Sequence, residues 1–430
     1  MNTLILALSG SAAAHQHPPL RMAGLRAVAG SGLLVAVGYI DPGNWATDIA
    51  GGSGFGYGLL AVVFAAALLG MGFQVLTARL ALATGQDLAT LTARHLPRPL
   101  ARSAWLAGEA AILATALAEL IGGAIALRLL LGLPLMAGVG VTALGTLAVF
   151  YAARRNADRH EQVIGVLLGV VAVAFVYLLV RAQPSAGDVA SGIADTGNTL
   201  RDPEAFLIAL GILGATLMPH NLYLHSGALA QRAAALSAAD RPMAMRIARN
   251  DTMVSLGIAM LINAAIMVVA AASLSGSGPV VASLDGAHAA IGQTLGAAAA
   301  VVFGVALYAA GQSSTITGVM AGRVLSRGFQ PAGSGWWERR RAVITRAVAG
   351  VAALALLAAT GGRDPDGLLV LSQVILSLAL PFALIPLVVL ARRRDVMGRY
   401  VLRGGWAVAA LAATTGIVLL DGYLLAQTLF

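Results

Sequence analysis

Two short polar stretches interrupt long apolar segments of this 430-residue chain. The first is Asp41-Pro42-Gly43-Asn44, and the second is Met218-Pro219-His220-Asn221. Both share the pattern x-Pro-x-Asn, and each lies near the middle of its apolar segment. A pair of Gly/Pro-interrupted hydrophobic segments in corresponding positions of two halves is typical of a secondary-transporter binding site.

The residue types at the two breaks are those of a cation site. Proline removes a backbone donor and opens the helix, and free carbonyls at membrane depth occur only where they line a cavity or are buried in protein. Asp41 adds charge, Asn44 an amide oxygen and Met218 a thioether. Prolines that only kink a helix are the alternative. Two matched breaks, one with an intramembrane carboxylate, favour a site.

The donor set also narrows the choice of ion. Oxygen ligands alone would suit Mg²⁺, Ca²⁺ or Na⁺, whereas a thioether favours softer metals. Asp41 and Met218 together therefore predict Mn²⁺ or Fe²⁺, with Co²⁺, Zn²⁺ and Cd²⁺ as competitors. Met218 alone is weak evidence, because methionine is an ordinary packing residue. The Asp41 carboxylate could bind either H⁺ or a divalent cation, which would make it a minimal exchange device.

The composition indicates an all-α polytopic membrane protein. Hydrophobic residues make up 58% of the chain, charged residues 11%, and the mean hydropathy is +0.83. Many segments have the roughly 20 apolar residues that a membrane-spanning helix needs. Alternating strand patterns are absent, which argues against a β-barrel. The net charge of +9 comes from arginines in short loops, so it indicates membrane orientation and no nucleic-acid partner. The absence of cysteine excludes disulfides and thiolate metal sites.

Eleven apolar segments are predicted, at about 24–52, 57–83, 102–132, 134–153, 161–181, 203–230, 251–274, 290–322, 341–360, 366–391 and 404–428. The N-terminal tail and every second loop carry two to five arginines each, whereas the opposite loops carry four in total. The positive-inside rule then predicts a cytoplasmic N-terminus and an external C-terminus. Residues 1–23 are expected to form a cytoplasmic tail and 24–430 a single transmembrane domain. The loop 181–202 is expected to be external, with little structure of its own.

Four stretches resemble the Nramp (natural resistance-associated macrophage protein) family of divalent metal transporters. They are "DPGNWATDIAGGSGFGYGLL", "GILGATLMPHNLYLHS", "GQSSTITGVMAG" and "LSQVILSLALPFALIPL", in the expected order within residues 25–395. The resemblance implies a LeuT-type fold of two inverted five-helix repeats, at about 24–181 and 203–391, plus an eleventh helix at 404–428. Helices 1 and 6 would be unwound at the bilayer midplane. It also implies proton-linked uptake of Mn²⁺ or Fe²⁺ across the bacterial inner membrane.

The resemblance further implies a set of site residues. Asp41, Asn44 and Met218 would be side-chain ligands, joined by the Ala215 carbonyl, and the Gly38 carbonyl and Gln373 would complete the shell in an occluded state. A second group would form the proton pathway and its polar network: His220, Glu119, Glu109, Arg232, Arg341 and Arg346.

The chain departs from the family pattern on helix 3. Relatives carry an Asp three residues before the Glu of the network, where this chain has Ala116 before Glu119. That Asp is the expected proton acceptor, so its absence puts the usual proton route in doubt. Glu119 could instead serve to pair with Arg232 or with a helix 9 arginine, and His220 could simply bond loosened backbone. Asp421 is expected at the lipid periphery or the external interface.

The leading hypothesis is thus import of Mn²⁺ and Fe²⁺, with H⁺ as co-substrate, no permanent cofactor, and no partner beyond the metal and the lipid bilayer. The alternative is a metal facilitator with weak or absent proton coupling, which Ala116 motivates. A sodium-coupled organic solute transporter fits less well, because a Gly-rich break would better receive a substrate carboxylate than one carrying Asp41. No HExxH or comparable spacing supports an intramembrane metalloenzyme.

Overall fold

The computed structural model describes residues 28–153, 157–234, 236–275, 283–329, 335–362 and 364–429, and these are helical apart from turns and loops. The predicted tail 1–23 lies outside the described residues. The first half contains the following elements: α2 (Ser31–Ala36), η1 (Val37–Ile40), α3 (Pro42–Phe55), α4 (Leu60–Thr84), α5 (Leu88–His95), α6 (Arg98–Leu131), α7 (Leu135–Ala153) and α8 (Ala157–Ala182).

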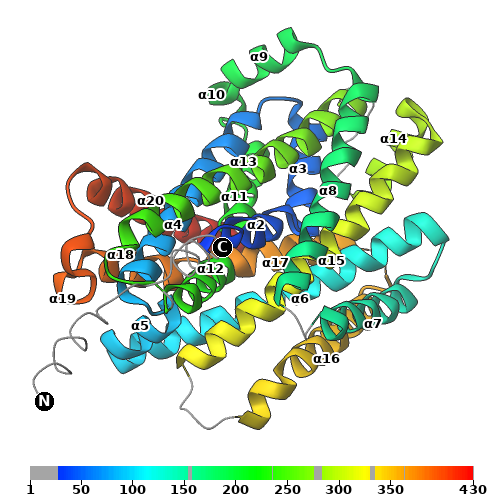
Figure 1. Ribbon diagram of the computed structural model, residues 1–430. Coiled ribbons are helices and arrows are strands. Elements are labelled where there is room, and N and C mark those ends of the chain that lie inside the picture. The colour runs from blue at the N-terminus through cyan, green and yellow to red at the C-terminus, as the bar shows by residue number, and fades with distance from the viewer. Residues whose placement is uncertain are drawn as a thin grey trace, which may run out of the picture.

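The second half follows two short connecting helices, α9 (Ala186–Ala194) and α10 (Thr196–Thr199). Its elements are α11 (Pro203–Thr216), α12 (Pro219–Ala233), α13 (Arg241–Leu274), α14 (Leu284–Leu295), α15 (Ala297–Phe329), α16 (Gly335–Ala359), α17 (Pro365–Ala379), α18 (Pro381–Arg392), α19 (Arg394–Met397), η2 (Gly398–Tyr400) and α20 (Gly405–Leu429). Figure 1 shows their arrangement.

Each predicted apolar segment corresponds to one helix or to two helices joined at a break. Among the described residues, eight helices are long and apolar enough to cross a membrane. Shorter apolar helices at Ser31–Ile40, Leu135–Ala148 and Val343–Ala359 correspond to the remaining three predicted segments, the first, fourth and ninth. Length and composition therefore confirm a polytopic helical membrane protein.

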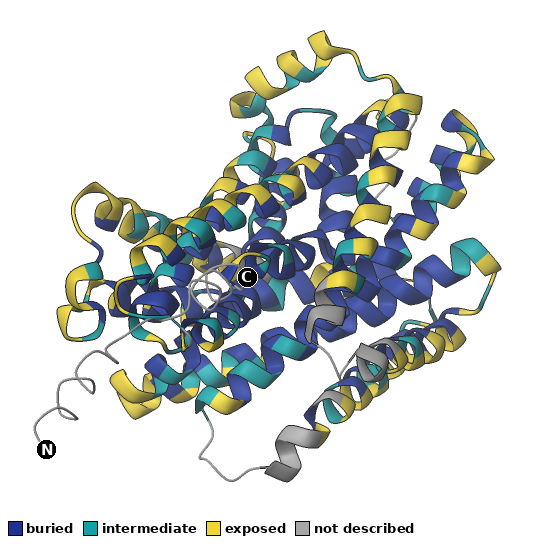
Figure 2. Ribbon diagram, in the orientation of Figure 1, coloured by how far each residue is buried: buried dark blue, intermediate teal, exposed yellow. Residues whose placement is uncertain are grey.

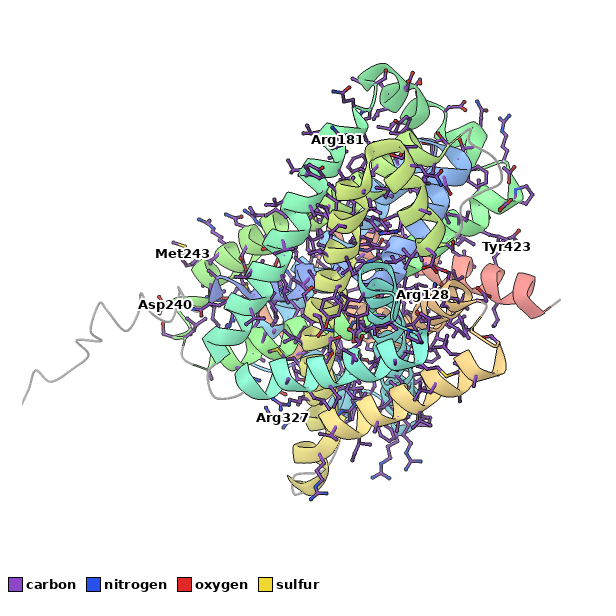
Figure 3. All side chains as sticks on the ribbon, turned by 90° about the vertical axis from the view of Figure 1, so that its right-hand side faces the viewer. Arg128, Arg181, Asp240, Met243, Arg327 and Tyr423 are labelled. Atoms are coloured by element: carbon purple, nitrogen blue, oxygen red, sulfur yellow. The ribbon has the colours of Figure 1, made fainter. Side chains whose placement is uncertain are left out.

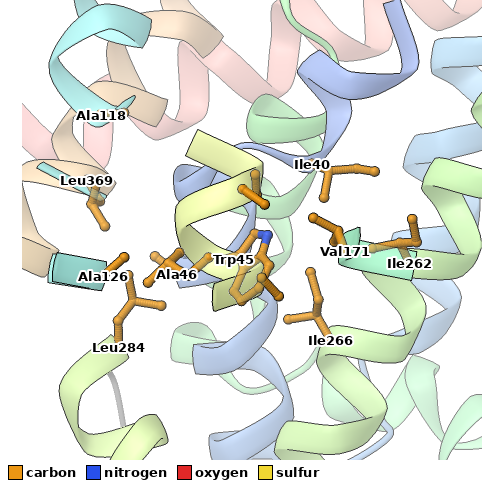
Figure 4. Close-up of a cluster of buried hydrophobic side chains, with 14 of the residues drawn as sticks. Ile40, Trp45, Ala46, Ala118, Ala126, Val171, Ile262, Ile266, Leu284 and Leu369 are labelled. Carbon is orange, nitrogen blue, oxygen red and sulfur yellow. The ribbon is translucent and has the colours of Figure 1, made fainter. Parts of the chain in front are cut away.

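The core lies where the two halves of the chain meet. Helix α6 packs against α15 and α17, and α13 packs against α3. The Trp45 ring on α3 meets Phe175 and Phe303 edge to face, with ring centroids 5.0 and 5.4 Å away, among apolar side chains that include Ile266 (Figure 4). Buried residues fill these central helices, whereas α9 and the outer face of α7 are largely exposed (Figure 2).

The structure corrects the prediction for the loop 181–202, which contains α9 and α10. The Ser185 hydroxyl caps α9 by accepting from the Asp188 N–H at 3.3 Å. Helix α9 also lies against the α3–α4 turn, because a Cβ on Gly192 would overlap the Tyr57 side chain. The short amphipathic helix is thus stabilised by a cap and by an apolar contact that the sequence alone does not reveal.

The predicted eighth segment, 290–322, is also divided differently. The chain turns at Gly296, whose φ of 100° favours glycine, so that α14 ends before the long helix α15 begins. In Figure 3, Arg181 and Arg327 lie toward opposite ends of the helical bundle, as expected for residues predicted on opposite sides of a membrane.

Candidate functional site

The first break places Asp41 between a short helical segment and the N-terminus of α3. The backbone is helical through Ile40, extended at Asp41 (φ −73°, ψ 164°) and helical again from Pro42. Asp41 Oδ1 caps α3 by accepting from the Asn44 N–H at 2.8 Å. Asp41 Oδ2 is fully buried and has no hydrogen-bond partner among the described residues. The carboxylate therefore has one oxygen fixed by the backbone and one available for a cation.

The two prolines remove specific donors from the helices around the breaks. Pro42 cannot donate to the carbonyl four residues earlier, which is that of Gly38, and Pro219 cannot donate to that of Ala215. These are the two backbone carbonyls that the family resemblance implies as metal ligands. Because each carbonyl lies four residues before a proline, each lacks its usual helical donor, which is a physical reason, independent of the resemblance, for both to be free to bind a metal.

The second break faces the first. Met218 is the extended residue between α11 and α12, and it is fully buried. The Asn221 amide donates to Met218 Sδ at 3.7 Å, and a Cβ on Gly38 would stand 2.7 Å from Asn221 Oδ1. The missing side chain at Gly38 thus lets the unwound part of helix 1 approach the start of α12.

Helix α17 brings Gln373 to the same place. A Cβ on Gly43 would overlap the Gln373 amide, so this side chain lies directly on the Asp41–Asn44 turn. Gln373 Oε1 is buried and unbonded within the described ranges. The Asn44 amide donates to the Tyr39 carbonyl at 2.8 Å, which leaves its own oxygen for a ligand.

The donors gathered here are one carboxylate, two amide oxygens, two proline-freed carbonyls and a thioether. No group of three or more His, Cys, Asp or Glu side chains that could hold a metal occurs in the part of the chain that the structure describes. The site therefore differs from a closed structural metal centre. Mixed, mostly neutral ligands fit a divalent ion that must also leave.

A buried ion pair links helix α6 to α16 beside this site. Arg346 Nη2 lies 2.5 Å from Glu119 Oε2, and both side chains are at most 2% exposed. Ser314 of α15 also donates to Glu119 at 2.9 Å. The sequence left two arginine partners open for Glu119, Arg232 or an arginine on helix 9. Glu119 pairs with the helix 9 arginine, Arg346, and the pairing with Arg232 is wrong.

A second pair extends the network along the same helices. Arg341 Nη2 lies 2.5 Å from Glu109 Oε2, and the Trp105 indole donates to Glu109 Oε1 at 2.9 Å. A small cavity lies beside the Glu119–Arg346 pair and extends to Arg341. Its lining includes Ala116, Glu119, Gly318, Gly322, Arg341 and Arg346. Ala116 thus stands at the cavity wall, where an acidic side chain would face two arginines.

His220 points from the second break toward helix α6. Its Nδ1 lies 3.3 Å from the Thr115 hydroxyl, next to Ala116, and its Nε2 has no partner within the described part of the chain. His225 lies about one and a half turns further along α12. It contacts Gln74 at 2.9 Å, and Gln74 donates to the Tyr39 hydroxyl at 3.3 Å.

The structure gives the surroundings of two further residues that the sequence singled out. Arg232 belongs to the start of helix 1, where it donates to the carbonyls of Val28 and Ala29 at 3.4 and 3.3 Å. Asp421 is 7% exposed and accepts from the Ser377 hydroxyl of α17, so it faces the protein and the expected lipid-peripheral position is wrong. Both outcomes depend on which helices pack together, which a single sequence does not show.

Sequence reasoning also missed three polar residues near the breaks. Asn221 bridges Gly38 and Met218, and its equivalence to Asn44 in the x-Pro-x-Asn pattern was the available signal. Asn263 of α13 donates to the Tyr39 carbonyl at 2.7 Å. Asp48 lies two turns after Asp41 on α3, is 2% exposed, and has an Oδ2 without a partner among the residues described. A polar side chain in an apolar helix was the signal for the last two.

Two broken helices that meet at a cation-ligand set define a membrane transporter of the LeuT type. The Nramp family model, described as natural resistance-associated macrophage protein-like, matches residues 32–427. The chain belongs to this family, as its motifs predicted.

Named relatives are similar over most of the chain. A Brucella suis protein named divalent metal cation transporter MntH is 46% identical over 391 residues, 90% of this chain and 85% of that protein. MntH 1 of Pseudomonas aeruginosa is 45% identical over 409 residues, 94% and 92% of the two chains.

Solved structures agree with the fold. The manganese transporter of Eremococcus coleocola, in complex with an aromatic bis-isothiourea substituted compound, has a TM-score of 0.82 at 32% identity, covering 92% of this chain and 85% of that one. MhsT in complex with L-phenylalanine has a TM-score of 0.60 at 17% identity, covering 91% and 98%. The latter likeness concerns the fold alone, and it confirms the predicted LeuT-type architecture.

Proposed function

We propose that this protein imports divalent transition metal ions, Mn²⁺ and Fe²⁺, by alternating access about a site at the two helix breaks. The observation that carries the proposal is Oδ2 of Asp41 at the N-terminus of α3, which is fully buried and has no hydrogen-bond partner in the described part of the chain. A carboxylate at membrane depth is costly without a cation or proton, and Asn44, Met218 and Gln373 surround it with further donors. The named relatives support a divalent metal as the substrate.

The thioether supports a transition metal over Mg²⁺ or Ca²⁺. Met218 is fully buried at the extended residue of the second break, where packing against lipid cannot explain it. Hard ions gain little from sulfur, whereas Mn²⁺ and Fe²⁺ tolerate it better. The same donor set gives no support to an organic substrate, whose larger volume would need a cavity rather than a set of converging ligands.

Proton movement is the second part of the proposal. It is supported by His220, which contacts Thr115 of α6, and by the two buried glutamate–arginine pairs that α6 forms with α16. The alternative is a facilitator with weak or absent coupling. Its support is Ala116, which presents a methyl group to the cavity where relatives would present an acid.

We further propose that the protein lies in the bacterial inner membrane with a cytoplasmic N-terminus and that it transports the metal inward. The arginine distribution supports this orientation. The metal ion, the co-transported proton and the lipid bilayer are the only partners that the function requires.

The test is Mn²⁺ uptake into proteoliposomes containing the full chain. Asp41→Asn keeps the shape of the side chain and removes the charge, and saturable uptake should be abolished. Asp395→Asn is the matched control, because Asp395 is an exposed carboxylate that pairs with Arg393, and its replacement should leave uptake unchanged. Uptake by Asp41→Asn at the wild-type rate would exclude the assigned site.

A further inference from the structure

A buried carboxyl group outside the two repeats contacts the helix that carries Gln373. Asp421 lies on α20, the eleventh transmembrane helix, and is 7% exposed. Its Oδ1 accepts from the Ser377 hydroxyl on α17, and its Oδ2 has no hydrogen-bond partner in the described part of the chain. Tyr423, two residues further, stacks edge to face on Phe206 of α11, with ring centroids 5.5 Å apart, and is labelled at this end of α20 in Figure 3.

The ionised form of this group would be poorly compensated. One neutral hydroxyl is a weak partner for a buried carboxylate, since a buried charge needs an opposite charge or several donors. The ion pairs within the described ranges do not include Asp421. Taking up a proton would remove the charge and leave a carboxyl that still pairs with Ser377.

The charged groups of the surrounding helices do not compensate a negative charge on Asp421. Helix α20 packs against α18, α11 and α4, and Ser377 adds α17. The ionisable side chains of these helices within the described residues are Arg392, Glu204, Arg79 and Asp366. Arg392 and Glu204 are exposed, Arg79 donates to the Tyr400 and Val401 carbonyls, and Asp366 accepts from the Leu284 N–H. On α20 itself, Tyr423 is the only other ionisable residue within the described range.

Ser377 connects this carboxyl to the metal site by two routes. It lies four residues after Gln373, so both side chains share one face of α17. It also touches α11 beside the second break, because a Cβ on Gly214 would stand 2.8 Å from the Ser377 hydroxyl oxygen. Gly214 precedes Ala215, whose carbonyl is one of the two freed by proline. A shift of α17 at Ser377 would therefore move Gln373 relative to the Asp41 turn.

We propose that Asp421 is a proton-binding residue of this transporter and positions Gln373 through Ser377 and α17. The proposal rests on the proposed metal transport. The neutral acid holds α17 against α20 and keeps Gln373 on the metal-site turn, whereas the ionised form draws water or cations and loosens that contact. The chain lacks an acid at position 116, and Asp421 supplies a buried carboxyl on a different helix.

The experiment measures Mn²⁺ uptake by the full chain in proteoliposomes from about pH 5 to about pH 8, together with Mn²⁺ binding affinity in detergent. Wild-type uptake should fall at least about threefold as the pH rises and Asp421 loses its proton. Asp421→Asn cannot ionise and should stay within about twofold of its low-pH rate throughout, with metal affinity unchanged. Ser377→Ala removes the link and should also flatten the profile. Asp395→Asn, an exposed carboxylate, should retain the wild-type profile.

Three results would overturn the inference. One is a flat wild-type profile, and another is an Asp421→Asn profile that follows the wild type. The third is an equal loss at every pH, which would assign Asp421 a structural role only. If Asp421→Asn does not fold, Ser377→Ala provides the test: a dependence of its uptake on pH that matches the wild type would overturn the inference. Absence of Mn²⁺ uptake by the wild type at any pH would instead count against the proposed function.

Discussion

Replacing Ala116 by Asp tests how the polar network of α6 and α16 handles protons. Ala116 is 3% exposed, lines the cavity, and accepts from Arg346 Nη1 through its carbonyl at 3.4 Å. The network is balanced in charge, because Arg346 pairs with Glu119 and Arg341 with Glu109. Ala116→Asp adds a carboxyl group that has no cation of its own.

The repulsion between the new carboxylate and Glu119 can be estimated from the helix geometry. Positions 116 and 119 are three residues apart on α6, so their Cβ atoms are about 5 to 6 Å apart. Two carboxylates at that separation repel by about 3 kcal/mol at an effective dielectric constant of about 20. Attraction to Arg346 offsets this repulsion, and the cost of removing a charge from water, several kcal/mol, remains. The new carboxyl should therefore be protonated before metal enters and exchange its proton during transport.

The assay is paired measurement of Mn²⁺ uptake and internal acidification in proteoliposomes. Ala116→Asp should raise the H⁺ influx per Mn²⁺ at least about twofold over the wild type. Ala116→Asn has nearly the same shape and no exchangeable charge, so it should match the wild type. Equal acidification in all three proteins would refute the reasoning that the residue at position 116 decides the proton route.

Two further predictions concern the ligands and the ion pair. Met218→Ala should keep part of the Mn²⁺ uptake and increase competition by Mg²⁺ and Ca²⁺, measured by competition assays; equal competition already in the wild type would contradict the thioether argument. Glu119→Gln should lower the free energy of unfolding by about 3 to 5 kcal/mol, because Arg346 is left buried and unpaired. Thermal unfolding in detergent measures this, and adding Arg346→Met to Glu119→Gln should recover part of the loss; no recovery would argue against the pair.

Three of the proposed metal ligands could be picked out from the sequence because their chemistry is local. A proline frees the carbonyl four residues earlier and forces a break, whatever packs around it. The pairing of two such breaks then indicates one site. Asp41, Asn44 and Met218 are all within three residues of a proline, and the structure brings both breaks together through Gly38 and Asn221.

The residues that the sequence misplaced depend on contacts between distant helices. Several arginines could have paired with Glu119, and only the packing of α6 against α16 selects Arg346. Asp421 looked peripheral because its helix is apolar on all sides, yet it is buried among neighbouring helices and accepts a hydrogen bond from Ser377 of α17. The helix α9 was missed because a nine-residue segment is too short to form a helix on its own and depends on its cap and its contact with Tyr57.

The most direct test of the central claim is equilibrium binding of Mn²⁺ to the purified full chain. The claim that Asp41 and the two helix breaks form the metal site predicts one saturable Mn²⁺ per chain. Affinity should fall by at least about 100-fold in Asp41→Asn, since a buried charge partner contributes about 3 kcal/mol or more. Wild-type affinity in Asp41→Asn would contradict the claim.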